Sequence, residues 1–170
     1  MLVSEDGDMN RQGFALTELI VVIAIIATLL TIATMDFNSM SRKAQIERQT
    51  RELFAELNQA RMDSVFMKKR HKMVMQPNSY TFARFSSADE DRTTGGTTVR
   101  TKTVTYQMTK EDGTTSIANR VFEFDIRGFT NDLDTIRINP SGTAAQVDCI
   151  VVHNGRTNLG KIESNACVLR

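Results

Sequence analysis

Residues 13–35 read Gly-Phe-Ala-Leu-Thr-Glu-Leu-Ile-Val-Val-Ile-Ala-Ile-Ile-Ala-Thr-Leu-Leu-Thr-Ile-Ala-Thr-Met. The last 17 of these residues, from Leu19 to Met35, carry no charge. With residues 14–18 they make 22 residues, which extend about 33 Å as an α-helix. The hydrocarbon core of a bilayer is about 30 Å thick, so residues 14–35 are predicted to form a transmembrane helix.

Two other interpretations of this apolar segment fit the sequence less well. A helix buried in the core of a small domain seldom needs to be apolar on every face. A cleavable secretory signal has a positive start and a small-x-small cleavage site after its apolar run. Here no Ala-x-Ala follows, and the first 13 residues carry three acids and one base: Glu5, Asp6, Asp8 and Arg11. The apolar segment is therefore predicted to remain on the protein.

Glu18 stands inside the apolar stretch and needs an explanation. An ionised side chain at membrane depth costs about 2.5–3.5 kcal/mol on insertion scales. Either the carboxylate lies at the level of the lipid headgroups and faces water, or a cation pairs with it. The second possibility makes Glu18 a candidate functional residue.

Residues 12–19, Gln-Gly-Phe-Ala-Leu-Thr-Glu-Leu, closely resemble the processing site of type IV prepilins and type II secretion pseudopilins. The resemblance implies that residues 1–13 are a leader peptide, and that prepilin peptidase cuts between Gly13 and Phe14 and methylates the new N-terminus. It also implies that Glu18 pairs with the N-terminal amine of a neighbouring subunit during filament assembly. Gly13 suits this role because a residue without a Cβ lets a protease approach the backbone.

The helical pattern continues beyond the apolar segment. One stripe of small and apolar residues follows spacings of 7, 4, 3 and 4: Ile46, Leu53, Leu57, Ala60 and Ser64. Such spacing places them on one side of a helix. The helix is predicted to run from about Leu16 to Lys69, and residues 36–76 are assigned to its amphipathic half, with Pro77-Asn78 as a plausible stop.

After residue 78 the pattern changes to short β-type runs separated by turn signals. Strands are predicted at residues 79–85, 98–108, 121–126, 135–139 and 147–153, and residues 86–96 are predicted to be a mobile loop. An antiparallel sheet laid over the amphipathic half of the helix would cover its apolar stripe. The expected fold class is α+β and pilin-like, with a β-rich head at residues 77–170.

Three further segments resemble minor subunits of the pseudopilin H and FimT type. They are Arg51-Glu52-Leu53 with Leu57 and Ala60-Arg61, Asn139-Pro140-x-Gly142-Thr143-Ala144, and Ile150-Val151-Val152 followed by Gly155-Arg156. This resemblance implies a minor subunit that acts at the filament tip or in starting assembly.

Composition and the cysteines limit the alternatives. The 170 residues carry 21 Lys+Arg and 20 Asp+Glu, so a whole-chain basic field for nucleic acid is absent. Cys149 and Cys167 are expected to form a disulfide if the head is periplasmic, and two reduced thiols are the other possibility. A nucleophile built from Cys149 with His71 or His153 has no signature sequence around it. We predict no catalytic residue, no cofactor and no metal site.

Basic residues support two weaker hypotheses. The run Lys68-Lys69-Arg70-His71-Lys72 is interpreted as a solvated helix end near the negative pole of the helix dipole, or as a grip on phosphate or an acidic partner. Some FimT-type pilins bind DNA through a C-terminal Gly-Arg-x-Arg motif, of which Gly155-Arg156 keeps only the first half. Possible DNA contacts would be Arg156, Lys161 and Arg170.

The sequence therefore predicts a structural protein and not an enzyme. It would be a minor pilin or pseudopilin that spans the inner membrane once, with a periplasmic head, before it enters a pilus or pseudopilus. Its partners would be other pilin or pseudopilin subunits, prepilin peptidase and the inner-membrane assembly platform. The alternative function is a DNA-binding minor pilin displayed on a pilus for DNA uptake.

Overall fold

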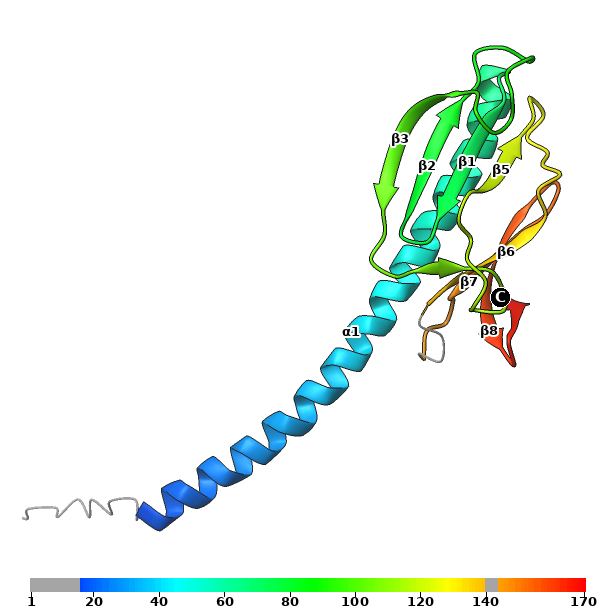
Figure 1. The fold of residues 1–170 in the computed structure, drawn as a ribbon. Coiled ribbons are helices and arrows are strands. Elements are labelled where there is room, and N and C mark those ends of the chain that lie inside the picture. Colours follow the sequence, from blue (N-terminus) through cyan, green and yellow to red (C-terminus); the bar gives the residue numbers. More distant parts are fainter. Residues whose placement is uncertain (1–15, 140–143) are drawn as a thin grey trace, which may run out of the picture. The chain divides into compact units, whose positions relative to one another are not determined.

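A computed structural model describes residues 16–139 and 144–170, without the side chains of residues 32–36. The chain divides into two compact units, Met1–Ser39 and Met40–Arg170, which we call the N-terminal and C-terminal units. Helix α1, Leu16–Met67, runs through the boundary between them (Figure 1).

The described part of the N-terminal unit is helical and apolar. Two of its threonines return their hydroxyls to the helix backbone: Thr28 donates to the carbonyl of Ile25 at 2.8 Å, and Thr31 donates to that of Ala27 at 2.9 Å. These bonds satisfy the hydroxyl donors within the helix. Among the residues described, no helix is both long enough and apolar enough to cross a bilayer.

In the C-terminal unit, the predicted stripe on α1 is the buried face of the helix. Ile46, Leu53, Leu57, Ala60 and Ser64 are all at most 1% exposed. Thr50, which is not part of the predicted stripe, is also fully buried on this face and donates its hydroxyl to the carbonyl of Ile46 at 2.8 Å. The stripe packs against apolar residues of both sheets in one hydrophobic core.

The described residues of this unit form nine strands in two antiparallel sheets, where one sheet was expected. The first sheet has the order β3-β2-β1-β5 and the second has the order β4-β6-β7-β8-β9. The strands are β1 (His71–Gln76), β2 (Ser79–Arg84), β3 (Thr97–Thr103), β4 (Met108–Thr109), β5 (Arg120–Phe124), β6 (Asp134–Ile138), β7 (Cys149–Val152), β8 (Thr157–Glu163) and β9 (Ala166–Leu169). Strands β1, β8 and β9 were not predicted.

The end of α1 differs most from the expectation. The helix stops at Met67, and Lys68 adopts a positive φ of 54°, which turns the chain into β1. Residues 71–76 therefore belong to the first sheet and not to the helix. The predicted end of the amphipathic half at residue 76 was wrong, because the helix ends at Met67. Strand β1 lies inside its sheet because it pairs with β2 on one side and with β5 on the other.

The basic run at residues 68–72 is consequently not a solvated helix end. Lys72 is only 4% exposed, and its ammonium group donates to the carbonyls of Arg92 and Thr93, both at 2.9 Å. Arg70 donates to the carbonyls of Ala88 and Glu90 at 2.8 and 2.7 Å. The segment 86–96, which the sequence suggested to be a mobile loop, is thus held by two cations from the start of the first sheet.

Cys149 and Cys167 form the disulfide that the sequence suggested, with their Cα atoms 6.1 Å apart. The bridge joins β7 to β9, although β8 lies between these strands. Gly160 of β8 pairs with Cys149, and a Cβ at Gly160 would lie 2.6 Å from the sulfur of Cys167 and 3.0 Å from that of Cys149. The bridge can cross β8 because Gly160 has no side chain.

We therefore expect Gly160→Ala to destabilise the C-terminal unit by about 1–3 kcal/mol, the usual cost of overpacking. The added methyl would push the sulfurs apart, so the fraction of free thiol should rise. Urea denaturation and thiol titration of the purified full-length protein measure the two effects. Gly155→Ala is the control, because its Cβ would meet only the edge of the Phe129 ring, at 3.3 Å. An alanine variant at 160 that is as stable and as fully oxidised as the wild type would contradict this explanation.

Candidate assembly site

Glu18 is the third residue of α1 and lies in the first turn of the helix. Its side chain is exposed, and none of the ion pairs among the described residues includes it. The first turn carries the positive end of the helix dipole, which favours a carboxylate there. Gly13 and Phe14, the predicted cleavage and methylation positions, lie outside the described residues. The structure thus places an available carboxylate beside the start of the helix.

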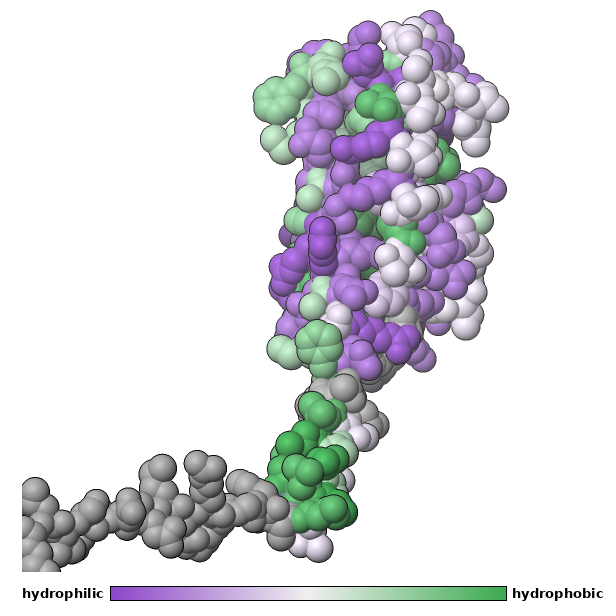
Figure 2. Space-filling model, turned by 90° about the vertical axis from the view of Figure 1, so that its left-hand side faces the viewer, coloured by the Kyte–Doolittle hydropathy of each residue, from purple (hydrophilic) through white to green (hydrophobic). Residues whose placement is uncertain are grey.

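The surface that follows Glu18 is apolar on every side of the helix. All the large hydrophobic side chains from Leu19 to Leu30 are between 42% and 60% exposed, and they form the green helical segment in Figure 2. Burying one such side chain contributes about 1.5–3 kcal/mol. A helix of this kind is therefore strongly stabilised when lipid or other apolar helices cover it on all sides.

Two of the three predicted DNA contacts lie on or directly after neighbouring strands: Lys161 is opposite Val168, and the amide of Arg170 donates to the carbonyl of Leu159 at 3.0 Å. Arg156 lies in the turn before β8, whereas Lys161 lies on β8 itself, five residues or about 16 Å along the strand. Arg170 forms an ion pair with Glu163, which offsets its charge. Because non-specific DNA affinity depends on releasing counterions from several phosphates, this arrangement gives the DNA-binding hypothesis no support.

Cys149 and His71, which were considered for catalysis, are engaged in contacts that stabilise the fold. Cys149 is bonded to Cys167, so its sulfur is not available as a nucleophile. His71 is 1% exposed, and its ring stacks on Phe82 with the ring centres 5.4 Å apart. Burial lowers the pKa of His71. Within residues 16–139 and 144–170, no three His, Cys, Asp or Glu side chains are grouped so as to hold a metal ion.

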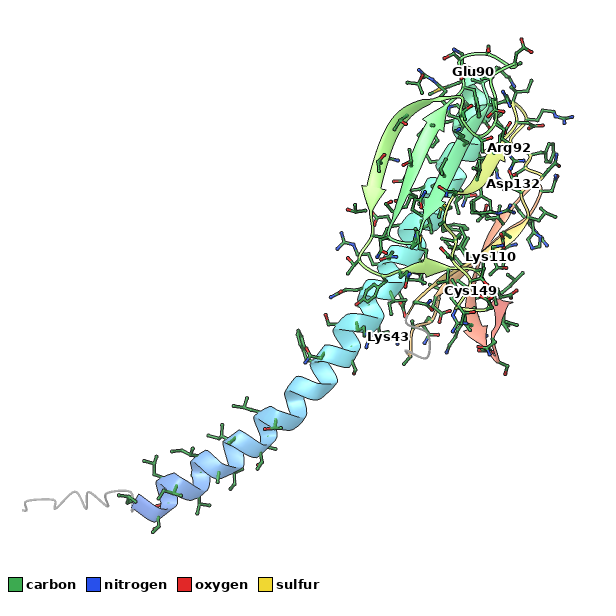
Figure 3. All side chains as sticks on the ribbon, in the orientation of Figure 1. Lys43, Glu90, Arg92, Lys110, Asp132 and Cys149 are labelled. Atoms are coloured by element: carbon green, nitrogen blue, oxygen red, sulfur yellow. A yellow bond between two sulfur atoms is a disulfide. The ribbon has the colours of Figure 1, made fainter. Side chains whose placement is uncertain are left out.

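Sequence reasoning missed a cluster of charged residues beside β5. Arg92 and Asp132, labelled in Figure 3, form an ion pair, and Arg92 also lies 3.6 Å from Glu123. Together with Arg70, Asp125 and Arg127 they line a polar cavity of about 490 Å³; Phe129, Asn131 and Asn154 complete its lining. Arg92 and Asp132 are 40 residues apart in two different loops, and no local sequence pattern connects them.

Comparison with known proteins clarifies the N-terminal segment. A family model described as the prokaryotic N-terminal methylation motif matches residues 8–34. This match covers the predicted cleavage position, Phe14 and Glu18. The match spans 27 of the 170 residues, so the similarity concerns this N-terminal segment.

The fold is compared separately, because the family model covers only the N-terminal segment. The structure is similar to that of the minor pseudopilin EpsH from the type 2 secretion system of Vibrio cholerae, with a TM-score of 0.51 and 12% sequence identity. The similarity covers 68% of this chain and 94% of EpsH. At this identity the likeness concerns the fold. No curated protein matches the sequence.

Proposed function

We propose that this chain is a minor structural subunit of a type IV pilus or a type II secretion pseudopilus. Its N-terminal helix would pack with the helices of other subunits, and its β-rich head would lie on the outside of the filament. The observation that carries the proposal is the methylation motif at residues 8–34, which includes a helical segment with exposed apolar residues on all sides. The fold likeness to a minor pseudopilin supports it.

The proposed mechanism begins with proteolysis. Prepilin peptidase cuts after Gly13 and methylates Phe14, which leaves a cationic amine at the start of α1. Glu18, exposed in the first turn, accepts the amine of a neighbouring subunit. An ion pair formed away from water removes most of the cost of burying either charge alone, so the pairing sets the register of one helix against the next.

Before assembly, the chain would span the inner membrane once, with residues 77–170 in the periplasm. The disulfide between Cys149 and Cys167 supports an oxidising location for the head, because cytosolic thiols are normally kept reduced. The inner-membrane assembly platform would then move the processed subunit from lipid into the filament. Exchange of lipid for neighbouring helices keeps the apolar surface of α1 covered throughout.

Gly13→Ala tests the proposal, since the peptidase would no longer find a residue without a Cβ at the cleavage position. The expected result is an unprocessed precursor that remains in the membrane fraction, measured as the intact mass of the purified protein. Gly7→Ala is the matched control, because it changes a glycine in the same leader away from the cut. Filaments that contain the Gly13→Ala chain with its leader attached would contradict the proposed processing step.

A further inference from the structure

Strand β5 forms one edge of the first sheet, with β1 on its inner side. Two backbone groups on its outer side meet side chains instead of another strand. The amide of Glu123 donates to a carboxylate oxygen of Asp132 at 2.9 Å, and the carbonyl of Val121 accepts from the guanidinium of Arg92 at 3.4 Å. One donor and one acceptor of the strand edge are thus satisfied by an ion pair.

This ion pair is held in place from both of its loops. Asp132 has a side chain only 7% exposed, and its own amide donates to the hydroxyl of Thr130 at 3.1 Å. The backbone of Arg92 is fixed because its carbonyl accepts from the buried ammonium of Lys72. Arg92 and Asp132 therefore meet the edge of β5 as a preorganised unit.

The two occupied groups are those that a second β5 would use. In an antiparallel pair, the residues on either side of a non-hydrogen-bonded position bond across to the partner strand. If two β5 strands met around a twofold axis through Phe122, the amide of Glu123 in each copy would bond to the carbonyl of Val121 in the other. The edge is therefore self-complementary, as a twofold symmetric contact requires.

The other edge of the same sheet is protected differently. Strand β3 carries Arg100 and Lys102, and its register with β2 shifts between Phe82 and Ala83, which places a bulge in the strand. Charged residues and bulges are common means of preventing edge-to-edge pairing. Strand β5 also carries two charged residues, Arg120 and Glu123, but its register with β1 runs without a shift from His71 to Met75, so it has no such bulge.

We infer that the outer edge of β5 is a strand-addition surface for a second copy of this chain, and that the Arg92–Asp132 pair keeps it closed. Asp132 accepts the hydrogen bond, and Arg92 donates the hydrogen bond, that a neighbouring strand would otherwise make with β5. The pair therefore blocks the binding of a second β5. This role depends on contacts within the C-terminal unit alone. It is therefore independent of which filament the protein enters, and of whether it enters one.

The test compares Asp132→Ala with wild type in the mature full-length chain in detergent micelles. Removing the carboxylate takes away a hydrogen bond to a charged group, so the amide of Glu123 should exchange its hydrogen about tenfold faster or more in dilute samples. At higher concentration the variant should dimerise, as measured by light scattering, while the wild type stays monomeric. Arg92→Ala is measured alongside, because its side chain is 47% exposed and contributes little to the core.

Arg127→Ala is the matched control. Arg127 lines the same cavity and also forms an ion pair, with Asp125, but it makes no hydrogen bond to the outer edge of β5. The Arg127→Ala protein has the same N-terminal helix as the other variants, so any association through that helix would be equal in all of them. Folded Asp132→Ala and Arg92→Ala variants that remain monomeric, or that keep the wild-type exchange rate at Glu123, would overturn the inference. If Asp132→Ala loses its circular dichroism signal, Arg92→Ala alone decides the question.

Discussion

Replacing Glu18 by alanine is expected to leave cleavage after Gly13 intact and to reduce entry into filaments by about 100-fold. The variant keeps the motif around the cut, so the peptidase should still process it. It lacks the carboxylate that would pair with the amine of a neighbouring subunit. In the variant, the amine of the neighbouring subunit stays unpaired among apolar helices. This costs about 3 kcal/mol, which corresponds to a reduction of about 100-fold. Quantitative immunoblots of sheared filaments and membranes measure the distribution.

Two controls separate pairing from a general effect of charge. Glu5→Ala removes an acid from the leader, which is absent after cleavage, so assembly should be unchanged. Glu18→Gln keeps the size of the side chain but not its charge, and should assemble as poorly as the alanine variant. Wild-type amounts of Glu18→Ala in filaments would reject the pairing role while leaving the fold and the processing step untouched.

Leu57→Ala is expected to cost about 2–5 kcal/mol of the free energy of unfolding of the C-terminal unit. Leu57 is fully buried on α1, where it belongs to the core shared by the helix and both sheets. Truncating it loses apolar contacts and leaves a cavity that the surrounding strands cannot fill completely. For a domain with a total stability of about 5–15 kcal/mol, the loss is large enough to lower the amount of folded protein.

Met62→Ala supplies the comparison for this prediction, because Met62 lies on the same helix and is 51% exposed. Its effect should stay within about 0.5 kcal/mol. Both values can be obtained from urea denaturation followed by circular dichroism. Equal destabilisation by the two substitutions would mean that the stripe on α1 is not the core face of the helix.

Much of the fold follows from patterns that the sequence displays locally. Leu53, Leu57 and Ala60 recur at helical spacing, and burial of that face is what such spacing predicts. Strand β5 alternates Phe122 and Phe124 with Glu123, so its two faces were apparent.

The missed strands lack such signals. Strand β1 begins inside a basic run, where His71 and Lys72 suggested a solvated helix end although both are buried in the structure. Strand β8 carries Gly160 at its centre and does not alternate, because the disulfide must pass over that position. In both cases tertiary contacts, with the loop at 86–96 and with the bridge, decide the local structure.

Some functional residues could likewise be predicted from the sequence, and others could not. Glu18 could be identified because an acid within an apolar helix is costly and therefore conspicuous. The closure of the β5 edge could not be predicted, because Arg92 and Asp132 lie in loops and are brought together only by the folded sheets. The predicted DNA contacts show the converse. Each is basic, but Arg170 is paired with Glu163, and Arg156 lies in the turn before β8.

The central claim is that Glu18 meets the N-terminal amine of an adjoining subunit, and zero-length carbodiimide coupling in isolated filaments tests it most directly. The coupling joins a carboxylate to an amine only where the two are in contact. Mass spectrometry should find the peptide containing Glu18 joined to the N-terminal peptide of a neighbouring subunit, and Glu18→Gln should abolish that product. N-terminal amines joined to other carboxylates, with Glu18 left unmodified, would contradict the account.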